Sequence, residues 1–161
     1  MRVELRWPLA TAAASPEGAV RALVLDTNIV LDLLVFRDPA TALVRQLLHT
    51  GALRWVATAP MREELARVLT YPQVAPRVDF YGLTSASVLQ SFDAQVQTVA
   101  EAARVPATCR DADDQKFLDL AAAERAVLLS KDKAVVALRK RLLPYGAHVG
   151  SVLVALQPLS P

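Results

Sequence analysis

The sequence predicts a single α/β domain built in three layers (α/β/α), with a central parallel sheet between two layers of helices. Short apolar runs that fit buried strands alternate with segments of helical periodicity about 10 to 15 residues long, the pattern of successive βαβ units. The chain has 161 residues, of which 53% are hydrophobic and 21% charged. This composition excludes extensive disorder, and the length suits one hydrophobic core.

Four segments have the composition of strands. In the clearest one, residues 20–25, an apolar run ends abruptly at Asp26, as a strand buried on both faces would. The other three are residues 53–57, 126–130 and 149–154. Sites in open parallel sheets form beyond the carboxyl ends of the strands, so the polar residues that follow these runs are the first candidates for function.

Helices are predicted between these strands from the spacing of apolar side chains and from capping residues. Asp38 and Pro39 start a helix that ends at Gly51. The other predicted helices cover residues 59–70, 84–100, 112–125 and 133–143. Taken together, the elements place the domain at residues 19–156, with residues 1–18 as an N-terminal extension of uncertain order and residues 157–161 as a C-terminal tail.

Several classes of protein are disfavoured by composition. No apolar run approaches the roughly 20 residues that span a bilayer, and the first residues lack a signal-peptide pattern, so we expect a cytoplasmic protein with no membrane partner. The single cysteine, Cys109, excludes an internal disulfide framework and is expected to be a buried apolar residue. His49 and His148 are expected to be structural or exposed rather than zinc ligands.

Helical periodicity selects two acidic residues as inward-facing. Glu64 lies at the edge of the apolar stripe of its helix, whereas Glu63 is rotated by about 100° toward solvent. Asp114 heads the apolar stripe of the helix that follows it. Asp111 is explained as a helix N-cap, and Asp113 as a supporting residue that reaches a metal through water or favours the positive end of the helix.

Two further aspartates follow strands: Asp26 directly, and Asp132 two residues after the third apolar run. Four carboxylates in one cleft repel one another, and a hard cation that prefers oxygen ligands, Mg²⁺ or Mn²⁺, relieves this repulsion. We therefore predict that Asp26, Glu64, Asp114 and Asp132 hold one or two such cations, which can activate water and stabilise the leaving oxygen of a phosphodiester.

Other residues are predicted to assist these acids. Asn28 and Ser130 support the carboxylates, and Thr27 is a weaker candidate for orienting the site. The net charge of +2 says little about a polyanionic partner, so the local distribution of basic residues matters more. The candidates for binding an RNA backbone are Arg110, Lys131 and Lys133, which are equally compatible with a solvated surface.

Each acid also has a simpler explanation. Asp26 and Asn28 fit helix caps, Asp132 fits a turn, and Glu64 fits a surface glutamate with a long side chain. For the whole chain, a non-catalytic interaction module and a phosphatase or receiver-like domain remain open, because one fold hosts different chemistries. A receiver would need a phosphorylatable aspartate after a central strand and a lysine opposite.

The ordered set of acids resembles that of PIN-domain nucleases. The sequence from Val24 to Leu31 is similar to their opening strand and turn, which carries the first metal-binding aspartate at the position of Asp26. Glu64 and Asp114 match the second and third acids. Ser130-Lys131-Asp132 resembles the Thr-x-Asp element that carries the fourth, with serine where threonine is commoner.

This resemblance covers residues 20–155, and residues 109–114 are typical of the VapC-like branch, described as toxin components of toxin–antitoxin systems. It implies a PIN-like fold and an endoribonuclease that depends on Mg²⁺ or Mn²⁺. It also implies an RNA substrate, a homodimer and a small cognate antitoxin that silences the enzyme.

Overall fold

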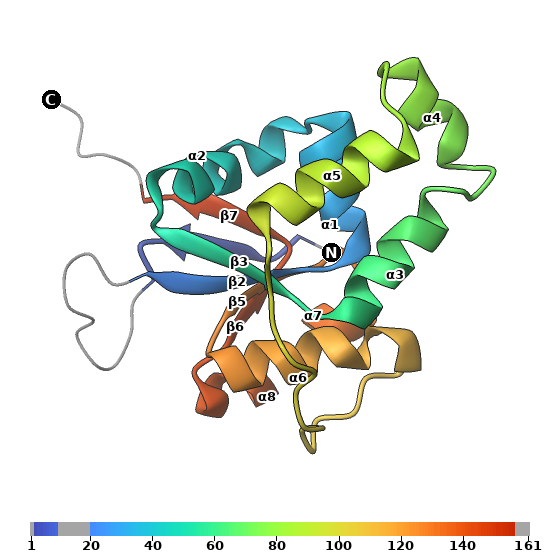
Figure 1. Ribbon diagram of the computed structural model, residues 1–161. Helices are drawn as coiled ribbons and strands as arrows, with labels where there is room; N and C mark the ends of the chain where they lie inside the picture. Colours follow the sequence, from blue (N-terminus) through green and yellow to red (C-terminus); the bar gives the residue numbers. More distant parts are fainter. Residues whose placement is uncertain (1, 10–19, 157–161) are drawn as a thin grey trace, which may run out of the picture.

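A five-stranded, all-parallel sheet forms the centre of the computed structural model, which describes residues 2–9 and 20–156. Its strand order is β4-β3-β2-β5-β6 (Figure 1). The strands are β2 (Arg21–Leu25), β3 (Leu53–Ala57), β4 (Gln97–Thr98), β5 (Val127–Leu129) and β6 (His148–Gly150). The predicted parallel α/β class is confirmed.

Helices cover both faces of this sheet, which completes the three layers (Figure 1). On one side lie α2 (Ala42–Thr50) and α5 (Ser85–Gln95), and on the other α6 (Gln115–Glu124) and α8 (Arg139–Leu142). Trp55 of β3 meets Phe92 of α5 edge to face, with ring centroids 5.3 Å apart. The central strands β2 and β5 are buried along almost their whole length, as their continuous apolar composition predicts.

The segment after β2 is helical at once. Helix α1 (Thr27–Leu31) runs directly into η1 (Asp32–Phe36), a π-helical turn. Neither element is delimited by the sequence pattern, because their nearly continuous apolar run lacks a polar face from which a helical period could be read. Asp26 caps α1, so the end of the strand and the start of the helix meet at this one residue.

Other helices differ from the predictions in their bounds. Helix α3 (Ala59–Val68) is as expected, but α4 (Ala75–Phe80) was not predicted: it is short, and its Pro76 fits both a helix break and the first turn of a helix. Helix α5 ends at Gln95 and is followed by β4 rather than continuing to residue 100. The predicted helix over 133–143 is divided into α7 (Lys133–Val136), α8 and η4 (Leu143–Tyr145). Short 3-10 turns precede two helices, η2 (Pro39–Thr41) before α2 and η3 (Ala112–Asp114) before α6.

The N-terminal segment contains a strand where no element was predicted. Residues of β1 (Glu4–Trp7) pair in parallel with β7 (Val152–Ala155), in a register that aligns Glu4 with Val152. A strand of four residues is too short for its alternation to stand out in a sequence. The predicted strand over 149–154 is likewise divided between β6 and β7. The remainder of the predicted extension, residues 1 and 10–18, and the predicted tail lie outside the described residues.

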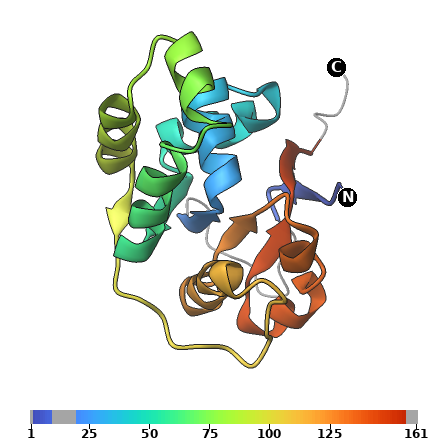
Figure 2. The ribbon, with the colours of Figure 1, turned by 90° about the vertical axis from the view of Figure 1, so that its right-hand side faces the viewer.

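A long segment, residues 99–111, connects β4 to η3 around the outside of the molecule (Figure 2). Buried polar side chains of α6 hold it: the Asp119 carboxylate accepts the Val105 amide at 3.0 Å, and Gln115 Oε1 accepts the Cys109 amide at 2.7 Å. Cys109 is buried, as expected for a small apolar residue. These contacts attach to α6 the segment that ends at Asp111. No helix of the described ranges is long and apolar enough to cross a membrane.

Candidate acidic metal site

A hollow of about 190 Å³ lies where the central strands end. All four carboxylates predicted from the sequence line it, although they come from four separate segments of the chain. Its lining consists of Asp26, Thr27, Asn28, Glu64, Val68, Asp111, Asp114 and Asp132, a set we call the acidic pocket. Parallel strands bring their carboxyl ends to one edge, which places Asp26 and Asp132 there together.

Asp26 is the most deeply buried of these acids, with 4% of its surface exposed. Its Oδ1 accepts the Ile29 amide at 2.9 Å, and its Oδ2 accepts a hydrogen bond from the hydroxyl of Ser130, which is fully buried. Burial raises the pKa of Asp26, and the hydrogen bonds from Ser130 and the Ile29 amide oppose that rise. Both oxygens are therefore fixed in orientation before any ligand arrives.

Asp111, Asp114 and Asp132 form the tightest group, since each offers a carboxylate oxygen within 4.8 Å of the other two. Burial, a hydrogen bond to Asp132 and the charge of Asp111 raise the pKa of Asp114 to about 8. The pKa of Asp132 is lowered because its carboxylate accepts that hydrogen bond and one from the Ala134 amide. The pair thus holds one proton at neutral pH, as two crowded carboxylates do when no cation is present.

Two hydrogen-bond donors hold the carboxylate of Glu64. The Thr27 hydroxyl donates to Oε2, and Lys116 Nζ lies 2.9 Å from Oε1. Both members of the ion pair are mostly sheltered, with 13% of the Glu64 side chain and 26% of the Lys116 side chain exposed. Lys116 was not among the predicted site residues. Its position two residues after Asp114 carries no sequence signal for a contact with α3.

The other predicted residues lie around the acidic pocket in different ways. Ser130 lies behind Asp26, and Asn28 is exposed at the lining. Asp113 is exposed and lines no part of the pocket, but its carbonyl accepts a hydrogen bond from Lys116. Asp111 is the N-cap that was predicted, accepting the Asp113 amide at 3.0 Å, and in addition belongs to the acid group.

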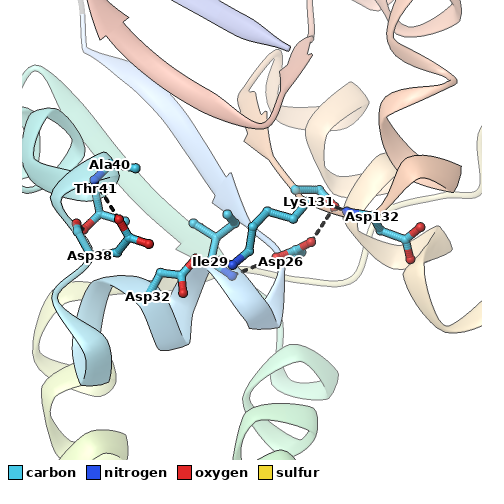
Figure 3. Close-up of polar contacts among 9 residues, drawn as sticks. Asp26, Ile29, Asp32, Asp38, Ala40, Thr41, Lys131 and Asp132 are labelled. Carbon is cyan, nitrogen blue, oxygen red and sulfur yellow. Dashed lines mark hydrogen bonds and ion pairs between the residues drawn. The ribbon is translucent and has the colours of Figure 1, made fainter. Parts of the chain in front are cut away.

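The three predicted RNA-binding residues are separated by the structure. Arg110 is exposed, and its charge helps to lower the pKa of Asp132, so it lies near the acidic pocket. Lys133 is exposed at the start of α7. Lys131 points the other way and forms an ion pair with Asp32, Nζ to Oδ2 2.6 Å (Figure 3).

The donor set of the acidic pocket fits a hard divalent cation. Its lining carries carboxylate, hydroxyl and amide oxygens, and no histidine or cysteine among the described residues takes part. Zinc sites, by contrast, favour nitrogen and sulfur ligands. A larger hollow of about 670 Å³ between α2 and α5 is lined by no carboxylate, so the chemistry of the lining identifies the candidate site and size does not.

Comparisons with known proteins agree with this geometry. A family model described as the PIN domain matches residues 22–134. Among solved structures, this chain is similar to a chain in the crystal structure of VapBC2 from Rickettsia felis, which is bound to a DNA fragment from the VapBC2 promoter. The TM-score is 0.54 and the sequence identity is 15%. The match covers 84% of this chain and 99% of that chain, and at this identity it shows the fold alone. No curated protein matches the chain. Since the family model spans well over half of the sequence and includes all four predicted acids, the chain belongs to the PIN domain family.

Proposed function

We propose that this protein is an endoribonuclease that depends on Mg²⁺ or Mn²⁺ and hydrolyses RNA phosphodiester bonds. The metal ligands and catalytic residues in this proposal are Asp26, Glu64, Asp114 and Asp132. One observation carries it: these acids line a single hollow, in which carboxylate oxygens of Asp111, Asp114 and Asp132 lie within 4.8 Å of one another. Such a cluster requires a counter-charge, and a divalent cation is the natural one.

When bound, the cation would lower the pKa of a water molecule and stabilise the leaving oxygen of a phosphodiester. The chain's own residues prepare the site for it. Asp26 is oriented by Ser130 and the Ile29 amide, so it needs no reorganisation. On metal binding, Asp114 would release to solvent the proton that it shares with Asp132, which would make both carboxylates available as ligands.

Positive and amide groups at the edge of the acidic pocket are suited to a phosphate. Lys116 lies beside Glu64, Arg110 lies near Asp132, and Asn28 is exposed at the lining. Charged donors of this kind neutralise phosphate oxygens and hold the backbone in register. The choice of RNA rather than DNA rests on the resemblance to PIN-domain nucleases.

We further propose that the chain is the toxin of a type II toxin–antitoxin system, a cytoplasmic homodimer silenced by a small antitoxin. The likeness in fold to a chain of VapBC2 and the sequence of residues 109–114 support this. The test is to express the chain with and without the product of the adjacent open reading frame. Growth arrest that the neighbour relieves, together with a stable complex of the two proteins, is the expected result.

The activity itself is tested with three proteins: wild type, Asp26→Asn and Asp79→Asn. Asp79 is exposed on α4 and serves as a control for loss of one carboxylate. Single-stranded and structured RNA are incubated with Mg²⁺, Mn²⁺ or EDTA. We expect cleavage by wild type and Asp79→Asn with metal only, and none by Asp26→Asn. Cleavage that survives EDTA or Asp26→Asn would refute the proposal, and absence of metal binding in calorimetry would favour a non-catalytic interaction module.

A further inference from the structure

Three consecutive residues after β5 send their side chains to three different partners. The Ser130 hydroxyl donates to Asp26, and Asp132 meets Asp114 in the acidic pocket. Between them, Lys131 extends away from the pocket to Asp32 (Figure 3). Lys131 and Asp32 line a separate hollow of about 350 Å³ on that other side. The ammonium group of Lys131 is therefore engaged outside the acidic pocket.

Asp32 is a buried carboxylate, with 11% of its side chain exposed, and it is the first residue of η1. Its partner Lys131 has 52% of its side chain exposed. In the described ranges, Lys131 is the one basic residue within ion-pair distance of Asp32. Leaving a buried carboxylate without its partner is costly, so this ion pair should persist even though one end reaches solvent.

The ion pair closes a loop of contacts around Asp26. Asp26 caps α1, and α1 continues into η1, where Asp32 lies. From the other side, Asp26 accepts hydrogen bonds from the Ser130 hydroxyl and the Lys131 backbone. These bonds, together with the positive charge of Lys131, lower the pKa of Asp26 against the effect of burial. The segment after β5 is thus attached to the same helical unit at two places, once at Asp26 and once at Asp32. If the attachment at Asp32 is removed, the segment keeps its contact with Asp26 and the hydrogen bond from the Ser130 amide to the Gly150 carbonyl, 2.9 Å, but loses the side-chain contact that holds Lys131.

We propose that Lys131 is a positioning residue of the acidic pocket. Its ion pair with Asp32 fixes the backbone of residues 130–132, which keeps Ser130 on Asp26 and Asp132 beside Asp114. The inference rests on the proposed metal-dependent function. It gives Lys131 a part different from binding the RNA backbone. Groups that orient metal ligands typically change metal affinity about 10-fold to 100-fold when they are removed.

The test measures Mn²⁺ affinity by electron paramagnetic resonance, separately from RNA affinity measured by fluorescence anisotropy without metal. Four proteins are compared: wild type, Lys131→Met, Lys131→Arg and Lys140→Met. Lys140 is exposed on α8 and controls for the loss of one positive charge. We expect Lys131→Met to weaken Mn²⁺ binding about 10-fold, with Lys131→Arg near wild type because it can still pair with Asp32. Lys140→Met is expected to change Mn²⁺ affinity less than about twofold.

A second comparison guards against a general loss of structure. Asp32→Asn removes the same ion pair from its other end and should weaken Mn²⁺ binding as Lys131→Met does. The double variant should be no worse than either single one, because both remove one interaction. The inference is overturned if Lys131→Met binds Mn²⁺ like wild type, or if only its RNA affinity falls. If wild type itself binds no Mn²⁺, the proposed function fails first, so the two failures are distinguishable.

Discussion

Binding of Mg²⁺ to the acidic pocket should depend steeply on pH, because the metal has to displace a proton. Asp114 has its pKa raised to about 8 by burial, by its hydrogen bond to Asp132 and by the charge of Asp111. Below that pH the apparent affinity falls about tenfold for each pH unit, since one proton is released for each ion bound. With a pKa of about 8, half of the sites are deprotonated at pH 8 but only about 1% at pH 6. The affinity should therefore fall about 50-fold over this range.

Isothermal titration calorimetry in buffers with different ionisation enthalpies measures both the affinity and the number of protons released. We expect about one proton per ion at pH 6.5 and close to none at pH 9. Asp114→Asn should bind Mg²⁺ weakly, with an affinity that varies less than about threefold between pH 6 and pH 8. Asp79→Asn, the exposed control, should keep the full pH dependence. An affinity of wild type that stays constant between pH 6 and pH 8 would refute the assignment of a shared proton to the acidic pocket.

Three further predictions concern stability. The pKa of Asp114 is about 8 in the folded protein and near 4 in the unfolded chain, so protonation of Asp114 stabilises the folded state fully below about pH 4. This stabilisation is lost as pH rises through about 8. The melting temperature of the metal-free protein should therefore fall from pH 6 to pH 9, and it should fall less in Asp114→Asn. Ser130→Ala removes a buried donor to Asp26 and should cost about 1–3 kcal/mol in urea unfolding; a loss under about 0.5 kcal/mol would contradict this role. Gly150→Ala would put a methyl group 2.6 Å from Leu5 Cγ of β1, and this overpacking should destabilise the protein by about 1–3 kcal/mol. An unchanged denaturation midpoint would show that β1 does not pack against Gly150.

Strong local signals explain which parts of the fold were predictable. The run that forms β2 ends at Asp26 in both sequence and structure, and the predicted strand over residues 53–57 coincides with β3. Helix α4 was missed because Pro76 is ambiguous between a breaker and a first-turn residue. β1 was missed because it is short and its pairing with β7 joins opposite ends of the chain. Neither error affects the acidic pocket, since α4 and β1 contribute nothing to its lining.

The sequence by itself determined that the acids would face inward at the carboxyl edge of a parallel sheet. Burial periodicity selected Glu64 and Asp114, and position after a strand selected Asp26 and Asp132. Only the tertiary structure decided which groups contact them. Lys116 meets Glu64 across 52 residues of sequence, and Lys131 turns away to Asp32 although its neighbours on both sides face the acids. Side-chain direction and ion pairing depend on three-dimensional distance and local burial, and residue spacing along one chain records neither.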